Sequence, residues 1–211
     1  TDFFVERVRD DTYLRGDEWV PLETRTETLR VAGGDDIEIE VRSTLHGPIV
    51  SEAIPATDAA VDTPALDTRL GEYAVALQWT ALEPGRTADA VFAFNLAQDA
   101  EDMQAAAALF EVPAQNIVFA TADGHIGYQA PGKIPVRQAV PDAEVPSDGT
   151  WPRDGSDERY DWQGYVPSEQ MPRVVDPAEG FIVAANQAVL PTGVAPFLTT
   201  DWDYGYRSQR I

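Results

Sequence analysis

Short apolar runs bounded by turn residues recur along this chain, and this pattern limits its fold more than any other feature. Residues 37–41 read Ile-Glu-Ile-Glu-Val, and they follow a Thr-rich run, TRTETLRV, at residues 24–31. The sequence Gly-Gly-Asp-Asp at residues 33–36 supplies a turn between the two runs. Alternation with a period of two residues is typical of a strand that buries one face. We therefore predict a β-hairpin with one buried face over residues 24–41.

Other segments also have the composition of strands or loops. Strands are predicted at residues 3–5, 73–81, 117–120 and 181–185. Asp123-Gly124 is a two-residue hairpin signal, so the strand over 117–120 is expected to return through Ile126 and Tyr128. Residues 52–70 are polar and punctuated by Pro and Ala, which predicts a loop or excursion, and the run at 91–94 is too short to classify.

One segment, residues 99–110, carries a clear helical period. Its apolar positions are spaced i, i+3, i+4 and i+7 and therefore share one face of a helix. These positions are Met103, Ala106, Ala107 and Phe110. Asp99 is a good N-cap residue, because its side chain can accept a hydrogen bond from a backbone amide of the first turn. We expect this apolar face to pack in the core.

Many strands and at least one clear helix place the chain in the α+β class. Its 211 residues are enough for one good-sized domain or two small ones. We treat residues 1–211 as a single region, in which residues 1–70 are a candidate β-rich excursion.

The composition excludes several classes of function. The formal net charge is −21, and such a field repels nucleic acid, so no nucleic-acid partner is predicted. The acidity fits either a strongly solvated surface or a cation site, although no EF-hand spacing is present. Cysteine is absent, which excludes disulfides, thiolate metal ligands and a cysteine nucleophile. No run approaches the ~20 apolar residues of a membrane helix, so no membrane span is predicted.

The residues alone reveal no complete active site. The two histidines, His46 and His125, lack metal-ligand spacing, and no nucleophile elbow, phosphate-binding loop or dinucleotide motif occurs. His46 stands in the turn His-Gly-Pro, and His125 follows the Asp-Gly turn. A structural role is the more common one for each residue in such a place. Carboxylates are too numerous for a catalytic pair to be chosen by spacing.

A set of ordered motifs does carry a resemblance. The motifs are FFVER, HGPIVS, VPAQNIVFATADGHIGYQAPGKIPVR, DWQGYVP, EGFIVAAN and YRSQRI, in this order from Phe3 to Ile211. Together they resemble the penicillin acylase (penicillin amidase) family of N-terminal nucleophile hydrolases. The resemblance implies part of an αββα sandwich, and the chain looks like a middle fragment of the second, or beta, chain of such an enzyme.

In that family the second chain begins with a Ser that acts as nucleophile, and its own α-amine acts as base. The opening Thr1-Asp2-Phe3-Phe4 does not match the family's S-N-N-W-like start, so Thr1 is not expected to be the nucleophile. The resemblance therefore implies an acyl-amide hydrolase whose Ser lies outside these 211 residues. The chain alone is then expected to be inactive, and a binding module without turnover is the remaining alternative.

Two candidate catalytic positions follow from the resemblance. Asn186 matches the family's oxyanion-hole Asn, whose amide N–H donates to the oxygen of the tetrahedral intermediate. This match accounts for a polar amide at the end of the apolar run over 181–185, since a buried amide is costly unless the fold or a ligand satisfies it. Arg207 matches the family Arg beside the nucleophile, where a fixed guanidinium would hold the site.

Two further positions match the family's acyl pocket. Trp79 corresponds to an aromatic pocket residue, although core packing is the ordinary role of a Trp in such a strand. Gln115 stands where phenylacetyl-specific members place an apolar residue, so this chain departs from the phenylacetyl pattern. The substrate is then expected to be a penicillin, a cephalosporin or another acyl amide, including an acyl-homoserine lactone.

The resemblance implies no cofactor for catalysis but allows a structural calcium ion. Asp2 matches one carboxylate ligand of that ion, and Asp201 and Asp203 lie near a second one without aligning well with it. The expected partners are a small acyl-amide substrate and the other segments of the same precursor, namely the alpha chain and the beginning of the beta chain. By the same resemblance the enzyme is expected to be periplasmic or secreted.

Overall fold

The computed structural model describes residues 1–54 and 72–211, which form two compact units. Unit 1 comprises Thr1–Leu82 and Arg137–Gln163, and unit 2 comprises Glu83–Val136 and Gly164–Ile211. Most of the loop predicted over residues 52–70 lies outside the described residues. Helices and strands are both present, and the α+β class is confirmed. No described helix has the length and apolar character needed to cross a bilayer.

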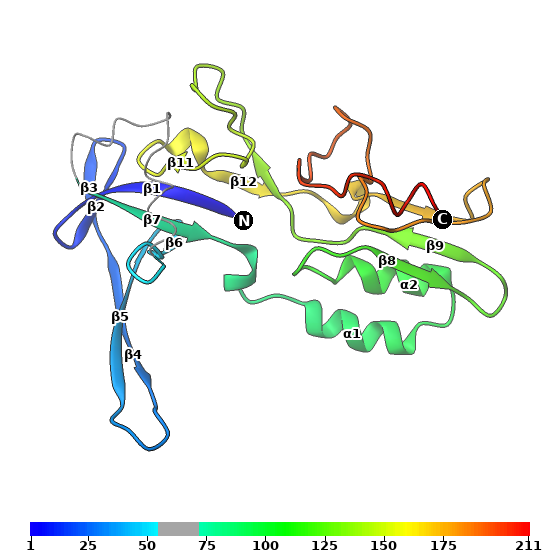
Figure 1. The fold of residues 1–211 in the computed structure, drawn as a ribbon, viewed down its shortest axis with the longest axis horizontal. Helices are drawn as coiled ribbons and strands as arrows, with labels where there is room; N and C mark the ends of the chain where they lie inside the picture. Colours follow the sequence, from blue (N-terminus) through cyan, green and yellow to red (C-terminus); the bar gives the residue numbers. More distant parts are fainter. Residues whose placement is uncertain (55–71) are drawn as a thin grey trace. The chain divides into compact units, whose positions relative to one another are not determined.

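Unit 1 is built on a five-stranded sheet in the order β11-β1-β2-β3, with β7 also paired to β1 (Figure 1). The strands are β1 (Asp2–Arg9), β2 (Thr12–Arg15), β3 (Glu18–Pro21), β7 (Glu72–Gln78) and β11 (Arg153–Asp154). Two short 3-10 helices, η3 (Thr80–Leu82) and η4 (Glu158–Tyr160), follow β7 and β11. The predicted strand at 3–5 is confirmed within β1. The one at 73–81 is confirmed over residues 73–78, whereas its last residues belong to η3.

The core of unit 1 forms around β1, because this central strand is covered on both faces. Phe4 is fully buried with Ala76, Val140 and Tyr160. A second buried cluster contains Tyr13, Leu22, Ile49 and Ala74. The charged side chain of Glu6 lies on the same strand and is also fully buried.

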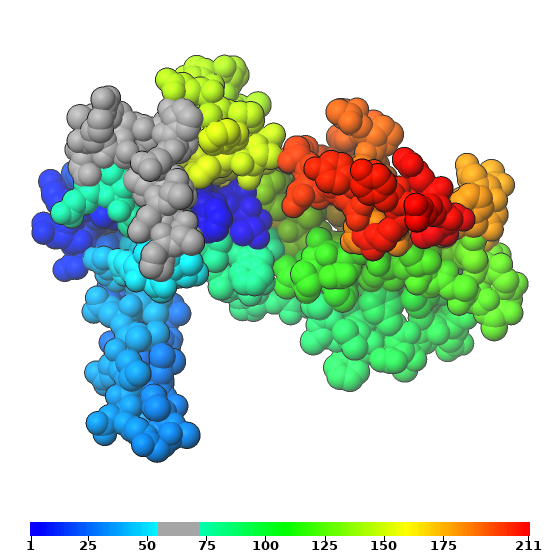
Figure 2. All heavy atoms as spheres, viewed as in Figure 1, coloured from blue at the N-terminus to red at the C-terminus, as the bar shows by residue number. Residues whose placement is uncertain are grey.

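The predicted hairpin is confirmed, but its burial is not. β4 (Glu23–Leu29) pairs antiparallel with β5 (Ile37–Thr44), and β5 pairs with the two-residue strand β6 (Gly47–Pro48). Ile37 is 52% and Ile39 39% exposed. Figure 2 shows the hairpin standing clear of the rest of unit 1. Alternation determines which side chains share a face, whereas burial also requires another element to cover that face.

Unit 2 contains two helices and a three-stranded sheet in the order β13-β9-β8. Its elements are α1 (Thr87–Leu96), α2 (Ala100–Ala108), β8 (Ile117–Ala120), β9 (Ile126–Gln129), η5 (Ser168–Gln170) and β13 (Arg173–Val175). The helix α2 packs on β8 and β9, and α1 packs on α2 (Figure 1). The short strands β10 (Pro135–Arg137) and β12 (Trp162–Tyr165) pair with each other.

In unit 2, the predicted helix cap and the predicted hairpin turn are both confirmed. Asp99 caps α2 by accepting a hydrogen bond from the backbone amide of Asp102 at 2.8 Å. Ala106 and Ala107 are buried, as expected of the apolar face. The strands β8 and β9 pair across the predicted turn at Asp123-Gly124. These elements depend on contacts between residues close in sequence, which a sequence pattern can reveal.

In unit 2, one run that the sequence left unclassified is assigned, and one expectation is corrected. The run at 91–94 belongs to α1, whose apolar side chains are not confined to one face and whose N-cap residue makes no side-chain hydrogen bond, so it carries neither a clear helical period nor a clear start signal. The predicted strand at 181–185 is not formed, since no described segment pairs with it. A strand requires a partner for its backbone hydrogen bonds, and an apolar run does not provide one.

Candidate active site

Asn186 lies in an irregular segment whose backbone forms hydrogen bonds with the side chain of the next residue, Gln187. The side chain of Gln187 accepts a hydrogen bond from the backbone N–H of Ala185 at 2.7 Å and donates one to the carbonyl of Val183 at 2.7 Å. Asn186 itself has a left-handed backbone, with φ of 63°, which Asn tolerates better than most residues. The side chain of Gln187 thus satisfies the backbone, while Asn186 is exposed.

Arg207 holds the amide of Asn186. Its Nη2 atom donates to Oδ1 of Asn186 at 2.8 Å and to Oδ2 of Asp203 at 2.7 Å. A guanidinium has donors and no acceptor, so the atom of the amide that faces it must be the oxygen. The Nδ2 hydrogens of Asn186 are therefore directed away from Arg207. The structure brings together the two predicted catalytic residues, which are 21 positions apart.

Asp203 is the third member of this cluster, and sequence reasoning considered it only as a poorly aligned calcium ligand. Its backbone N–H donates to the carbonyl oxygen of Asn186 at 2.9 Å. The hydrogen bond from Arg207 lowers the pKa of Asp203 below its ordinary 3.8, so the carboxylate is ionised at neutral pH. Its spacing of four residues from Arg207 is the one signal in the sequence that could have indicated the pair.

Gln115 is exposed and lines a cavity of about 280 Å³ in unit 2. Its backbone N–H donates to the carbonyl of Pro131 at 3.1 Å. Part of the lining comes from the segment between Asn186 and Arg207, namely Val189, Leu198, Thr199 and Trp202. The cavity is largely apolar, with Gln115 and Asn116 as its amide-bearing side chains. Its composition suits an apolar group that carries or lies beside a polar atom.

Trp79 belongs to unit 1, where it directly follows β7, and its side chain is not part of the core. It is 43% exposed, and its carbonyl accepts a hydrogen bond from the backbone N–H of Leu82 at 2.9 Å. Among the described residues, none buries Trp79 in the core, although core packing is the ordinary role of a Trp in such a strand.

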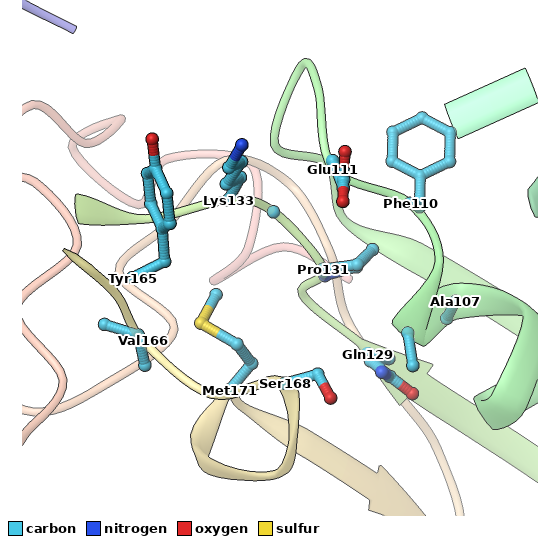
Figure 3. A pocket seen from close by; sticks show the side chains of 12 residues that line it. Ala107, Phe110, Glu111, Gln129, Pro131, Lys133, Tyr165, Val166, Ser168 and Met171 are labelled. Atoms are coloured by element: carbon cyan, nitrogen blue, oxygen red, sulfur yellow. The ribbon is translucent and has the colours of Figure 1, made fainter. Parts of the chain in front are cut away.

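A second cavity in unit 2, of about 200 Å³, contains none of the predicted site residues (Figure 3). It shares Pro131 and Met171 with the cavity at Gln115. Lys133, the one lysine of the sequence, pairs with Glu83 at 2.6 Å and lies 4.4 Å from the centre of the Tyr165 ring. These contacts fix the rim of the cavity, and they already compensate the lysine charge.

Asp2 lies in unit 1 and is held by cationic side chains. Its carboxylate, which is 2% exposed, accepts hydrogen bonds from Arg137 at 2.9 Å to each oxygen and from the indole of Trp162 at 2.6 Å. Nε of Arg153 is 3.4 Å away. The guanidinium groups of Arg137 and Arg153 already balance the negative charge of Asp2, which a calcium ion would need as a ligand. Among the described residues, no group of three potential metal ligands occurs. The residues present therefore do not fit a calcium site at Asp2.

His46 forms a buried ionic cluster that sequence reasoning did not identify. Its Nδ1 lies 2.7 Å from Oε1 of Glu6, and its Nε2 lies 3.0 Å from Oδ1 of Asp161. The ring stacks on Phe4 with 3.7 Å between centroids. Burial disfavours the charged ring, but the hydrogen bonds to Asp161 and Glu6 outweigh this effect and raise the pKa of His46 above 6.5. The predicted structural role of His46 is consistent with this arrangement.

His125 is the exposed counterpart of His46. Its side chain is 49% exposed, and its Nδ1 lies 2.6 Å from a carboxylate oxygen of Asp176. The hydrogen bond to Asp176 raises the pKa of His125 above 6.5. This pair joins the β8–β9 turn to the residue that follows β13.

The fold has a counterpart among solved structures. It is similar to the solved structure of a thermostable penicillin G acylase from Alcaligenes faecalis, with a TM-score of 0.70 and 24% identity, over 97% of this chain and 33% of that chain. The family model described as penicillin amidase matches residues 1–211. The chain therefore belongs to the penicillin amidase family.

Several relatives match over the whole chain, including the following two. The acyl-homoserine lactone acylase QuiP of Pseudomonas fluorescens (strain Pf-5) is 33% identical over 215 residues, which cover 100% of this chain and 24% of that protein. The penicillin acylase 2 proenzyme of Pseudomonas sp. (strain SE83) is 29% identical over 213 residues, which cover 100% of this chain and 25% of that protein. The chain thus spans about a quarter of the length of these relatives.

Proposed function

We propose that this chain is part of an acyl-amide hydrolase that works by acyl transfer to an N-terminal Ser outside these 211 residues. The Ser oxygen attacks the carbonyl carbon of the amide and loses its proton to the α-amine, giving a tetrahedral intermediate with a negative oxygen. The intermediate expels the protonated amine, and water then releases the acid from the acyl-Ser. Membership of the penicillin amidase family supports this reaction class.

Asn186 is proposed to donate to the negative oxygen of the intermediate. The observation that carries the proposal is the hydrogen bond from Arg207 to Oδ1 of Asn186 at 2.8 Å. This bond fixes the plane of the carboxamide and leaves Nδ2 as the outward donor. A donor that is already oriented needs no reorganisation as the charge develops, which is how an oxyanion hole stabilises a transition state.

The proposed substrate is an N-acyl amide with a flexible apolar acyl chain, such as an acyl-homoserine lactone. One of the matching relatives is named for that activity. Gln115 and Asn116 place amides in a cavity that is otherwise largely apolar. By the family resemblance, Gln115 stands where phenylacetyl-specific members have an apolar residue. We propose that Gln115, which lies in unit 2, contacts the acyl group. Trp79, which lies in unit 1, remains a substrate-binding candidate by family resemblance. Penicillins are the second candidate substrates, because another relative is named a penicillin acylase.

The complete enzyme is proposed to arise from a precursor that cleaves itself, with the other segments of the precursor as partners of this chain. The name proenzyme, carried by one relative, supports this maturation. By family resemblance, the enzyme is proposed to work in the periplasm or outside the cell.

The experiment is a comparison of Asn186→Ala with the unaltered mature full-length enzyme, on a panel of acyl-homoserine lactones and phenylacetyl amides. We expect kcat to fall about 10²–10³-fold, the usual loss for one oxyanion donor. Asn95→Ala is the matched control, because Asn95 donates to its own helix at the carbonyl of Val91. Circular dichroism and mass spectrometry of the mature chains establish that both variants fold and are processed.

Near-normal kcat in folded Asn186→Ala would overturn the assignment of the oxyanion donor. The 211-residue chain alone is expected to show neither turnover nor acyl-enzyme in mass spectrometry. An acyl group found on Thr1 of the isolated chain would contradict the proposal that the nucleophile lies elsewhere.

A further inference from the structure

Asp203 is connected to Asn186 in two ways, through its backbone and through its side chain. Its backbone N–H donates to the carbonyl of Asn186 at 2.9 Å. Its side chain accepts from the same Nη2 atom of Arg207 that donates to Oδ1 of Asn186. Both hydrogens of one guanidinium nitrogen are thus used, one for the carboxylate and one for the amide. The three residues form a closed ring of contacts.

This closed set of contacts determines the orientation of the Arg207 side chain, which is largely exposed. The side chain of Arg207 is 59% exposed, whereas that of Asp203 is 29% exposed. An exposed Arg has many rotamers, and only some of them place Nη2 beside Oδ1 of Asn186. The ionised carboxylate favours those rotamers, because an ion pair with a hydrogen bond is stronger than a neutral one.

We propose that Asp203 is a positioning residue for the hydrolysis reaction, which acts through Arg207 to hold the Asn186 amide with its Nδ2 toward the substrate. This inference rests on the proposed function of Asn186. Asp203 does not touch the substrate, so its loss should alter the chemical step rather than substrate binding. An exposed pair spaced by four residues that served only stability would contribute little and would leave kcat unchanged.

The test uses the mature full-length enzyme with the variants Asp203→Asn, Asp203→Glu and Asp201→Asn. Loss of one hydrogen bond to a charged group predicts a decrease in kcat of about tenfold or more for Asp203→Asn, with little change in KM. Asp203→Glu retains the charge and should recover part of the activity. Asp201→Asn makes the same change of charge two residues away and should behave like the unaltered enzyme, since the carboxylate at 203 is the one that meets Arg207.

A double-mutant cycle separates positioning from general stability. In an Arg207→Ala background, Asp203→Asn should have little further effect on kcat, because the residue through which it acts is missing. Independent losses that multiply would overturn the inference, and so would normal kcat in Asp203→Asn.

The outcome for Asn186 distinguishes the two proposals. Normal kcat in Asp203→Asn together with a large loss in Asn186→Ala refutes only the role of Asp203. Normal kcat in Asn186→Ala, or no turnover of any panel substrate by the unaltered enzyme, refutes the proposed function and with it this inference.

Discussion

Replacement of His46 by Phe would test whether unit 1 depends on its buried ionic cluster. Phe retains a ring that can stack on Phe4, but it removes both hydrogen bonds of the imidazole. The side chain of Asp161 is 27% exposed and keeps both Arg15 and access to water. Glu6 is 0% exposed and keeps only Thr44 as a described hydrogen-bond donor, at 2.8 Å. The cost of the substitution therefore falls mainly on Glu6.

Removal of one partner from a buried ion pair typically costs about 3–5 kcal/mol, since it leaves an uncompensated charge. We expect His46→Phe to lower the free energy of opening of β1 and β7 by about this amount. Adding Glu6→Gln to His46→Phe should recover much of the lost free energy, because it removes the isolated charge of Glu6. His125→Phe is the matched control, and it should have little effect because His125 and Asp176 are both about half exposed.

The assay is hydrogen–deuterium exchange measured by mass spectrometry on peptides that cover β1 and β7, in the full-length protein. Faster exchange of these peptides in His46→Phe, reversed by Glu6→Gln, is the expected result. Equal exchange in the His46→Phe and His125→Phe variants would refute the argument that Glu6 requires His46 to balance its charge.

Three further predictions follow from other contacts. The pKa of His46 is raised in the folded protein, so protonated His46 stabilises the fold below about pH 6.5, and this stabilisation is lost as the pH rises through the folded pKa. Hydrogen exchange of β1, corrected for the intrinsic rate, should therefore accelerate at alkaline pH in the unaltered protein but not in His46→Phe. Because Arg137 and Arg153 compensate Asp2, EDTA and Ca²⁺ should leave Tm unchanged, whereas Asp2→Asn should lower it; a lower Tm in EDTA alone would contradict this reasoning. Asp99→Ala should destabilise α2 by about 1 kcal/mol through loss of its N-cap; unaltered exchange in α2 would show that the cap contributes nothing.

Sequence patterns predicted the elements whose hydrogen bonds are local. The Asp99 cap of α2 joins residues three positions apart, and the β8–β9 hairpin closes around Asp123-Gly124. The alternation over residues 37–41 correctly predicted a strand of the β4–β5 hairpin. Such features depend on backbone preferences and side-chain periodicity over a few residues, so the sequence contains them directly.

Other features depend on what lies nearby in space. The hairpin β4–β5 is exposed because no described element covers its apolar positions, and residues 181–185 form no strand because no described partner pairs with them. The apolar side chains of helix α1 are not confined to one face, so its sequence lacked the amphipathic period that marks a helix. For the hairpin and for residues 181–185, the missing information was which element, if any, lies beside them.

The sequence by itself determined the family, the α+β class and the positions of Asn186 and Arg207 as candidates, because ordered motifs and local periodicity are properties of the chain. Only the tertiary structure decided what these residues touch. It brought Arg207 to an amide 21 positions away, and it buried His46 between carboxylates 40 and 115 positions away. Hydrogen bonds and ion pairs act over a few ångströms of space, and distance along the sequence does not reveal which groups the fold places within that range.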